Sequence, residues 1–272
     1  MDPAWLAANR ANWDERVGIH LGPRGYDLSR LRAGRGLFTP IEEAVLPSVD
    51  GKRVLHLQCH FGADTLKFSQ RGGEATGVDF SPAAITAATD LASELKLSAR
   101  FILSDVYDAP TALPEPASFD LVFASWGTIC WLPDVARWAE VIAYFLRPGG
   151  AFVFADGHPA ALTLDDGVPG SQGLPGWFAP YLDPTPMQLQ VERDYADPEA
   201  VLTNKATWEW LHPVGDVVTA LIRAGLRLEF LREHNAVAWQ MFKCLTQDTD
   251  GLFRWPDRPW LPLSYSLRAV RT

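Results

Sequence analysis

Carboxylates that could bind a nucleoside follow two apolar runs of this sequence. Asp79 ends the run EATGVDF, and Asp105 ends the run ARFILSD. Asp79 comes about 20 residues after the preceding apolar run, the usual place for a carboxylate that accepts hydrogen bonds from two ribose hydroxyls. Asp105 is placed to accept from an adenine amino group, with the Val106 amide meeting a ring nitrogen and Phe80 against the adenine face. The competing interpretations are a solvent-facing aspartate, a turn cap and core packing.

The segment LHLQCHFGADT, Leu55 to Thr65, has the outline of a nucleotide-binding loop between a strand and a helix. It carries one glycine, Gly62, where such loops usually carry two or three, and Gln58 and His60 replace the others. Gly62 stands where the chain must bend, and only glycine avoids the left-handed penalty. Gln58 and His60 suit side-chain hydrogen bonds to a carboxylate better than the close backbone approach that a pyrophosphate demands.

The elements that position these residues alternate between strands and helices. Apolar runs predict strands over residues 52–57, 74–80, 99–105, 119–125 and 151–156, and helices lie between them, beginning near residues 63, 82 and 133. Continuous apolar runs are typical of parallel strands buried on both faces. We therefore predict an α/β fold of the Rossmann-like, doubly wound type, with a mostly parallel seven-stranded sheet. An amphipathic helix over 214–224 and strands over 227–233 and 263–271 complete the sheet with an antiparallel final hairpin.

The regular alternation stops after Asp156. Residues 157–212 are rich in proline and glycine and are too long for a plain loop, so we predict an insertion after strand five that covers the substrate site. Residues 1–50 are expected to form an N-terminal helical cap or lid. Residues 51–156 and 213–272 then make up the cofactor-binding core.

The order of these motifs resembles that of the class I S-adenosylmethionine-dependent methyltransferases. VLHLQCHFG stands in place of that family's VLDLGCGxG loop, GVDFS matches its second-strand acid, and SDVYD matches its adenine-side acid. FDLVFAS and LRPGG match its fourth strand and the turn before its fifth. The resemblance is strong over residues 50–157, and the LHLQCHFG loop is similar to that of a bacterial small-molecule subgroup.

The resemblance implies binding of S-adenosyl-L-methionine and release of S-adenosyl-L-homocysteine. Gln58, His60, Gly62, Asp79, Phe80, Asp105, Val106 and Ser125 are the expected cofactor contacts. A sulfonium methyl is already activated, so the protein mainly positions the reactants, and a base is needed only when the acceptor carries a proton. His158, after the fifth strand, is the first candidate for that base or for a substrate hydrogen bond.

Four aromatic residues are the expected walls of the acceptor site, with plain core packing as the alternative. Trp126 follows the fourth strand beside the expected sulfonium. Trp13 and Tyr26 belong to the N-terminal segment that would close over the cofactor, and Tyr181 belongs to the insertion. Closing segments exclude water from such a site.

The composition limits which classes of binding partner we expect. The net charge is −9, and no run of basic residues exists, which disfavours nucleic acid and anionic membranes. Three scattered cysteines, without CxxC spacing, argue against a disulfide framework or a metal site and favour a reduced, cytoplasmic setting.

No apolar segment is long enough to span a membrane, and the N-terminus has no signal-peptide pattern. We expect a monomer or homodimer that methylates a small molecule on oxygen, nitrogen or sulfur. A cofactor-binding sensor or partner subunit without transfer activity is the alternative.

Overall fold

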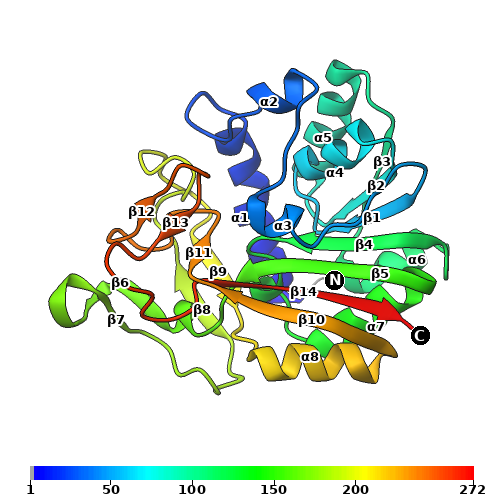
Figure 1. The fold of residues 1–272 in the computed structure, drawn as a ribbon. Helices are drawn as coiled ribbons and strands as arrows, with labels where there is room; N and C mark the ends of the chain where they lie inside the picture. Colours follow the sequence, from blue (N-terminus) through cyan, green and yellow to red (C-terminus); the bar gives the residue numbers. More distant parts are fainter. Residues whose placement is uncertain (1–2) are drawn as a thin grey trace.

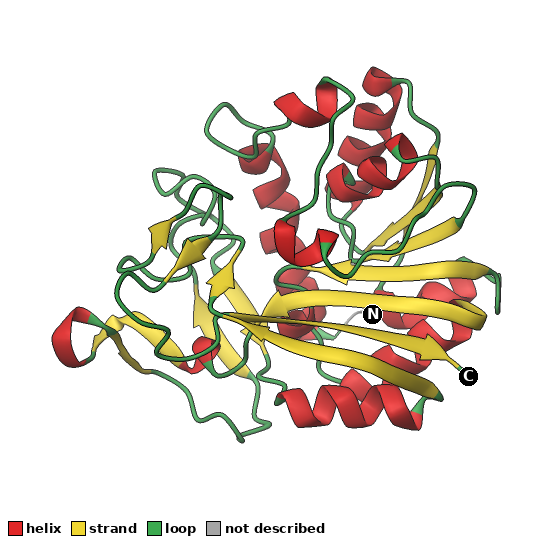
Figure 2. Ribbon diagram, in the orientation of Figure 1, coloured by secondary structure: helices red, strands yellow, loops and turns green. Residues whose placement is uncertain are grey.

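The computed structural model describes residues 3–272 and has one central seven-stranded sheet with helices on both faces (Figures 1 and 2). The strand order is β10-β14-β5-β4-β1-β2-β3. β1 to β5 pair in parallel, whereas β14 is antiparallel to both β5 and β10. This arrangement confirms the predicted α/β fold with an antiparallel ending. The bounds of the sheet strands are β1 Arg53–Leu57, β2 Glu74–Asp79, β3 Ala99–Leu103, β4 Phe119–Ser125, β5 Leu146–Gly157, β10 Leu226–His234 and β14 Ser264–Arg271.

The sheet strands are apolar on both sides because helices bury both faces. Leu55 and Leu57 of β1 pack into a cluster with the helices that follow β4 and the insertion, while Val54 packs into a second cluster on the opposite face. All three side chains are fully buried. The helix bounds are α1 Ala4–His20, α2 Ser29–Arg32, α3 Pro40–Glu43, α4 Ala63–Gln70, α5 Pro82–Leu95, α6 Ala109–Ala112, α7 Val135–Phe145 and α8 Val214–Arg223.

One predicted turn is part of a strand. The segment Arg147 to Gly150 was expected to separate a helix from the fifth strand, but β5 already begins at Leu146. Its pairing with β4 jumps from Phe119↔Leu146 to Leu121↔Ala151, so the glycine-rich segment forms a bulge inside β5. Gly149 supplies the positive φ, 77°, that the bulge requires.

Two excursions extend the carboxyl edge of the sheet. The first, between β5 and α8, contains two short hairpins, formed by β6 Leu164–Pro169 with β7 Pro175–Trp177, and by β8 Met187–Gln190 with β9 Ala206–Glu209. The second lies between β10 and β14 and has three two-residue strands. They are β11 Ala236–Val237, β12 Thr246–Gln247 and β13 Phe253–Arg254. The sequence analysis did not separate this second excursion from the core, because strands so short show no periodicity.

Neither a membrane span nor a metal cluster was found within residues 3–272. No helix there has the length and apolarity needed to cross a bilayer. No group of three or more histidine, cysteine, aspartate or glutamate side chains is placed to hold a metal ion in the same range.

Gly62 provides a test of how tightly the β1–α4 loop is built. Its φ is 75°, and an added Cβ would lie 2.6 Å from Phe101 Cε1 and 2.8 Å from Ala88 Cβ. Left-handed strain and overpacking together predict that Gly62→Ala lowers the free energy of unfolding by roughly 2–4 kcal/mol.

Gly215→Ala is the matched control for this substitution. Gly215 lies in α8 with open space around it, so alanine should raise stability by up to about 1 kcal/mol. Denaturant unfolding of both variants measures the difference. A Gly62→Ala protein as stable as the wild type would contradict the tight packing of this loop.

Candidate functional site

A cleft at the carboxyl edge of the sheet collects five of the predicted cofactor residues. Gln58, Asp79, Phe80, Asp105 and Val106 line a space of about 380 Å³, part of which is open to solvent. They come from the ends of β1, β2 and β3, as expected for an open parallel sheet. Val78 of β2 and Ser104 after β3 also line the cleft, and its other walls are Trp5, Leu6 and Asn9 of α1, with Trp131 and Leu132 after β4. The N-terminal helix is therefore the roof of the cleft.

Asp79 is held in place by two backbone amides. Its Oδ2 accepts from the His60 amide at 2.8 Å, and its Oδ1 accepts from the Ser81 amide at 2.9 Å. The side chain is buried, and this desolvation raises the pKa of Asp79 to about 6 despite the two amides, which favour the ionised form. Each carboxylate oxygen keeps a second lone pair, which suits Asp79 to accept hydrogen bonds from a diol.

Asp105, which also lines the cleft, begins a short 3-10 turn. Its Oδ1 accepts from the Tyr107 amide at 2.8 Å and caps the turn Val106–Asp108. Burial raises the pKa of this carboxyl above its usual value. The predicted turn-cap and ligand roles are compatible, since the cap uses only one oxygen. Phe80 is half-buried, and the guanidinium of Arg10 lies 5.9 Å from the centroid of its ring.

The loop after β1 is substituted but well defined. Gln58 and His60 have φ values of 57° and 49°, so two non-glycine residues adopt the left-handed conformation just before Gly62. Such conformations cost about 1–2 kcal/mol each and cluster at functional sites. The Gln58 side chain donates from Nε2 to the Thr128 carbonyl at 2.8 Å. Its Oε1 is buried with no hydrogen-bond partner among the described residues, so an acceptor is available to an ammonium group in the cleft.

The segment after β4 is held by a carboxylate that the sequence analysis left without a role. Asp156 of β5 accepts from the amides of Gly127, Thr128 and Ile129 at 2.5, 3.0 and 3.1 Å. Burial raises the pKa of Asp156, and these amides oppose the rise. Asp156 thereby positions the turn that leads to Trp131. In the sequence, the only sign of this role was the place of Asp156 near the carboxyl end of a buried strand.

His158, the predicted base, does not have a nitrogen free for catalysis. Its Nδ1 accepts from the Ala160 amide at 3.1 Å, and its Nε2 lies 2.9 Å from Glu233 Oε1 on β10. The ring is buried and packs edge-on against Tyr265, 5.7 Å away, and it does not line the cleft. These contacts fasten the end of β5 to β10 and do not support the predicted catalytic role.

Three further predicted residues also lie apart from the cleft. Trp126 packs edge-on against Trp239 of the second excursion, with ring centroids 6.0 Å apart. The Tyr181 hydroxyl accepts from the Val214 amide at 3.2 Å, at the start of α8. The Ser125 hydroxyl is buried without a hydrogen-bond partner among the described residues. The geometry thus supports packing or capping for Trp126 and Tyr181 in place of a substrate wall.

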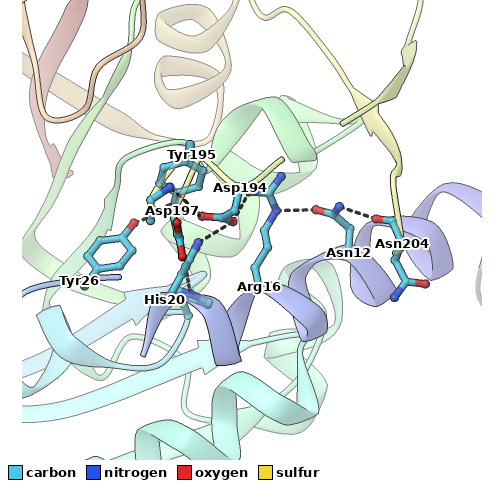
Figure 3. Close-up of polar contacts among 10 residues, drawn as sticks. Asn12, Arg16, His20, Tyr26, Asp194, Tyr195, Asp197 and Asn204 are labelled. Carbon is cyan, nitrogen blue, oxygen red and sulfur yellow. Dashed lines mark hydrogen bonds and ion pairs between the residues drawn. The ribbon is translucent and has the colours of Figure 1, made fainter. Parts of the chain in front are cut away.

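The roof helix α1 is docked through polar side chains (Figure 3). Asn9, Asn12, Arg16 and His20 are 1%, 0%, 4% and 0% exposed. Asn12 Nδ2 donates to the Asn204 carbonyl at 2.6 Å, and Asn12 Oδ1 accepts from Arg16 Nε at 2.8 Å. Asn9 Nδ2 donates to the Trp208 carbonyl, and its Oδ1 accepts from the Trp208 amide, both at 2.8 Å. The insertion therefore holds α1 over the cleft, although the sequence offered no amphipathic signal for this contact.

Trp13 and Tyr26 take their places around this docked helix. Trp13 packs edge-on against His60 and against Trp131, with centroid distances of 5.2 and 5.4 Å. The Tyr26 hydroxyl lies 2.6 Å from the Tyr195 hydroxyl of the insertion. Trp13 thus connects the substituted loop with the wall of the cleft, which keeps it a candidate for acceptor contact, while Tyr26 joins two covering segments.

Known proteins share this domain and this fold. Residues 54–150 match the family described as a methyltransferase domain. A phosphoethanolamine N-methyltransferase 1 of Triticum aestivum is 30% identical over 109 residues, which are 39% of this chain and 22% of that protein. This chain thus spans about a fifth of the length of the curated relatives it matches.

Solved structures with the same fold cover nearly the whole chain. An S-adenosylmethionine-dependent methyltransferase from Mesorhizobium loti is 24% identical, with a TM-score of 0.57 over 85% of this chain and 96% of that one. A glycopeptide N-methyltransferase complexed with S-adenosylmethionine is 18% identical, with a TM-score of 0.53 over 85% and 90% of the two chains. The domain match over residues 54–150 and the shared fold agree with the resemblance to the class I S-adenosylmethionine-dependent methyltransferases.

Replacing Asp79 tests the cofactor site directly. Asp79→Asn keeps the shape of the side chain but removes its charge, so we expect S-adenosylhomocysteine to bind about 10- to 100-fold more weakly, the worth of hydrogen bonds to a charged acceptor. Isothermal titration calorimetry measures the change. Asp90→Asn, an exposed aspartate on α5, is the control and should bind as the wild type does. Equal affinity in Asp79→Asn would rule out a ribose contact.

The affinity of the wild type should also depend on pH. Because the pKa of Asp79 is raised to about 6, the carboxylate is ionised above that pH and becomes protonated below it. Only the ionised form accepts hydrogen bonds on both oxygens. S-adenosylhomocysteine should therefore bind less tightly as the pH falls from 7 to 5. This loss should be missing in Asp79→Asn, and a pH-independent wild type would contradict the assignment.

Proposed function

We propose that this chain transfers the methyl group of S-adenosylmethionine to a small-molecule nucleophile. The observation that carries the proposal is the roofed cleft, which both Asp79 and Asp105 line. Asp79 would accept from the ribose hydroxyls, Asp105 would accept from the adenine amino group, and Phe80 would pack against the base. Gln58 and Val106 line the same cleft. His60 and Gly62 in the loop after β1, and Ser125 at the end of β4, are the further contacts that we propose for the cofactor.

When bound, the cofactor supplies an electrophilic methyl group on a positively charged sulfur. The residues of this chain then have two tasks. The loop after β1 and the turn held by Asp156 fix the direction of approach, and the docked helix α1 excludes water. Positioning of this kind supplies much of the rate enhancement in a displacement that needs no further activation of the methyl group.

A small acceptor fits the enclosure of the site. The cleft is covered by α1, and α1 is in turn bonded to the insertion at Asn204 and Trp208. A long polymer would have to displace this cover, and a net charge of −9 opposes a nucleic acid. The phosphoethanolamine and glycopeptide N-methyltransferases among the similar proteins bear names that agree with acceptors smaller than a nucleic acid. The atom that receives the methyl group is an oxygen, a nitrogen or a sulfur.

An assay with methyl-labelled S-adenosylmethionine tests the proposal. The protein is incubated with a panel of small alcohols, phenols, amines and thiols, phosphoethanolamine among them, and both the labelled product and S-adenosylhomocysteine are measured. We expect acceptor-dependent turnover in the wild type and in Asp90→Ala. Turnover should fall about 100-fold or more in Asp79→Ala at subsaturating cofactor, as lost binding of a charged acceptor predicts. Binding of S-adenosylhomocysteine without any transfer across the panel would favour the sensor or partner-subunit alternative.

A further inference from the structure

Asp194, His20 and His60 form a continuous hydrogen-bonded chain from the insertion to the loop after β1. Figure 3 shows its first two members, Asp194 and His20. His20 Nε2 lies 3.0 Å from Asp194 Oδ2, and His20 Nδ1 lies 2.8 Å from His60 Nε2. The side chains of Asp194 and His20 are both fully buried. Water therefore does not compete for these bonds, and each proton in the chain constrains the next.

Asp194 determines which atoms donate along this hydrogen-bonded chain. Burial opposes its ionisation, yet hydrogen bonds from His20 and from the Ala196 amide, with the Arg16 charge, hold the pKa of Asp194 below its usual value. Arg16 Nη1 lies 2.7 Å from Asp194 Oδ2, the oxygen that also faces His20 Nε2. An ionised carboxylate only accepts, so His20 must carry its proton on Nε2.

The tautomer of His60 follows from that of His20. In its neutral form, which has one N–H and one lone pair, His20 with its proton on Nε2 presents a lone pair at Nδ1. His60 must then donate from Nε2, and its own lone pair is left on Nδ1. Within residues 3–272, His60 Nδ1 has no hydrogen-bond partner. The chain thus ends in an unoccupied proton acceptor.

His60 itself does not line the cleft, but its direct contacts do or touch residues that do. The His60 amide binds Asp79, and its ring packs on Trp13, which also touches the cleft residue Trp131. Besides Asp79 below the loop, the titratable or charged groups that face the ring are Arg16 and His20 of α1, Tyr26, and Asp194 and Tyr195 of the insertion. Burial and the neighbouring His20 hold the pKa of His60 well below its usual value, so the ring is neutral at pH 7.

We propose that His60 Nδ1 takes the proton of a hydroxyl acceptor during methyl transfer, and that His20 and Asp194 are the positioning residues that keep Nδ1 free. The proposal rests on the proposed function and names its substrate class. In the step, the acceptor oxygen forms a bond to the methyl carbon, and the methyl–sulfur bond breaks with its electron pair on sulfur. The hydroxyl proton passes to His60 Nδ1, and the resulting imidazolium is stabilised through His20 by Asp194 before it releases the proton to solvent.

A hydroxyl suits this base better than an ammonium does. A hydroxyl becomes strongly acidic as its oxygen is alkylated, so a weakly basic imidazole can take the proton while the new bond forms. An ammonium holds its proton tightly until it is removed, and a ring whose pKa lies below the usual 6.5 removes it poorly. Two arms of one experiment separate these points.

The first arm reads the tautomers without any acceptor. Protein with 15N-labelled histidine is saturated with S-adenosylhomocysteine, and long-range 1H–15N spectra at pH 7.5 show which ring nitrogen carries each proton. We expect His20 and His60 to be protonated on Nε2 only, with His60 assigned from His60→Gln. In Asp194→Asn, the new amide can donate to His20 Nε2, so both histidines should move their protons to Nδ1. His212, whose Nε2 lies 2.7 Å from the Leu132 carbonyl, is the internal control and should not change.

His20→Gln breaks the same chain if Asp194→Asn fails to fold. In that variant, the His60 spectrum should show a mixture of tautomers in place of one. A wild-type His60 that carries its proton on Nδ1 would overturn the proposal. These spectra do not depend on methyl transfer. They therefore separate failure of the hydrogen-bonded chain from failure of the proposed function.

The second arm uses whichever acceptor the labelled-methyl panel identifies. His60→Gln should lower kcat by about 100-fold or more, the usual contribution of a general base. S-adenosylhomocysteine should still bind to this variant, because the His60 amide that donates to Asp79 is kept. The acidic fall in the wild-type kcat profile should disappear in the variant. A raised KM with unchanged kcat, or turnover with amines alone, would contradict the role or the substrate class.

Discussion

The cover of the site depends on one buried carboxylate. Asp194 of the insertion meets Arg16 and His20, which lie four residues apart on the same face of α1. An ion pair in such surroundings adds little net stability, but leaving one partner alone costs about 3–5 kcal/mol. Removing either partner from the docked structure would therefore weaken the contact between the insertion and the N-terminal helix.

That constraint connects the distant parts of the chain to the proposed chemistry. The docked helix places Leu6 and Asn9 over the cleft and Trp13 beside His60. The Asp79 carboxylate binds the His60 amide, so the residue proposed to receive the ribose also fixes the substituted loop. Gln58 and His60 replace glycines that such loops usually carry, and both adopt the left-handed conformation. Their side-chain hydrogen bonds, to the Thr128 carbonyl and with His20, offset the cost of that strain.

The core of the fold and its two covering segments could be predicted from the sequence, whereas the contacts between those two segments could not. Buried parallel strands are continuous apolar runs, and Asp79 and Asp105 follow two of them at a fixed edge, so sheet and cleft acids could be predicted together. The docked face of α1 is polar, and polar residues on a helix ordinarily predict exposure. Arg16 and Asp194 are 178 residues apart, and no local pattern joins them. The contact between His158 and Glu233 could not be predicted either, because a place after a strand gives no sign of it.

Hydrogen exchange of the α1 amides tests most directly whether Asp194 holds the cover closed. In the wild type, Ala4–His20 should exchange slowly, close to the protection of β4 and β5. In Asp194→Ala, exchange in α1 should accelerate at least about 100-fold, equal to about 2.7 kcal/mol, while the sheet strands stay protected. Unchanged protection of α1 in the variant would show that the helix is held by something other than this carboxylate, and would contradict the account.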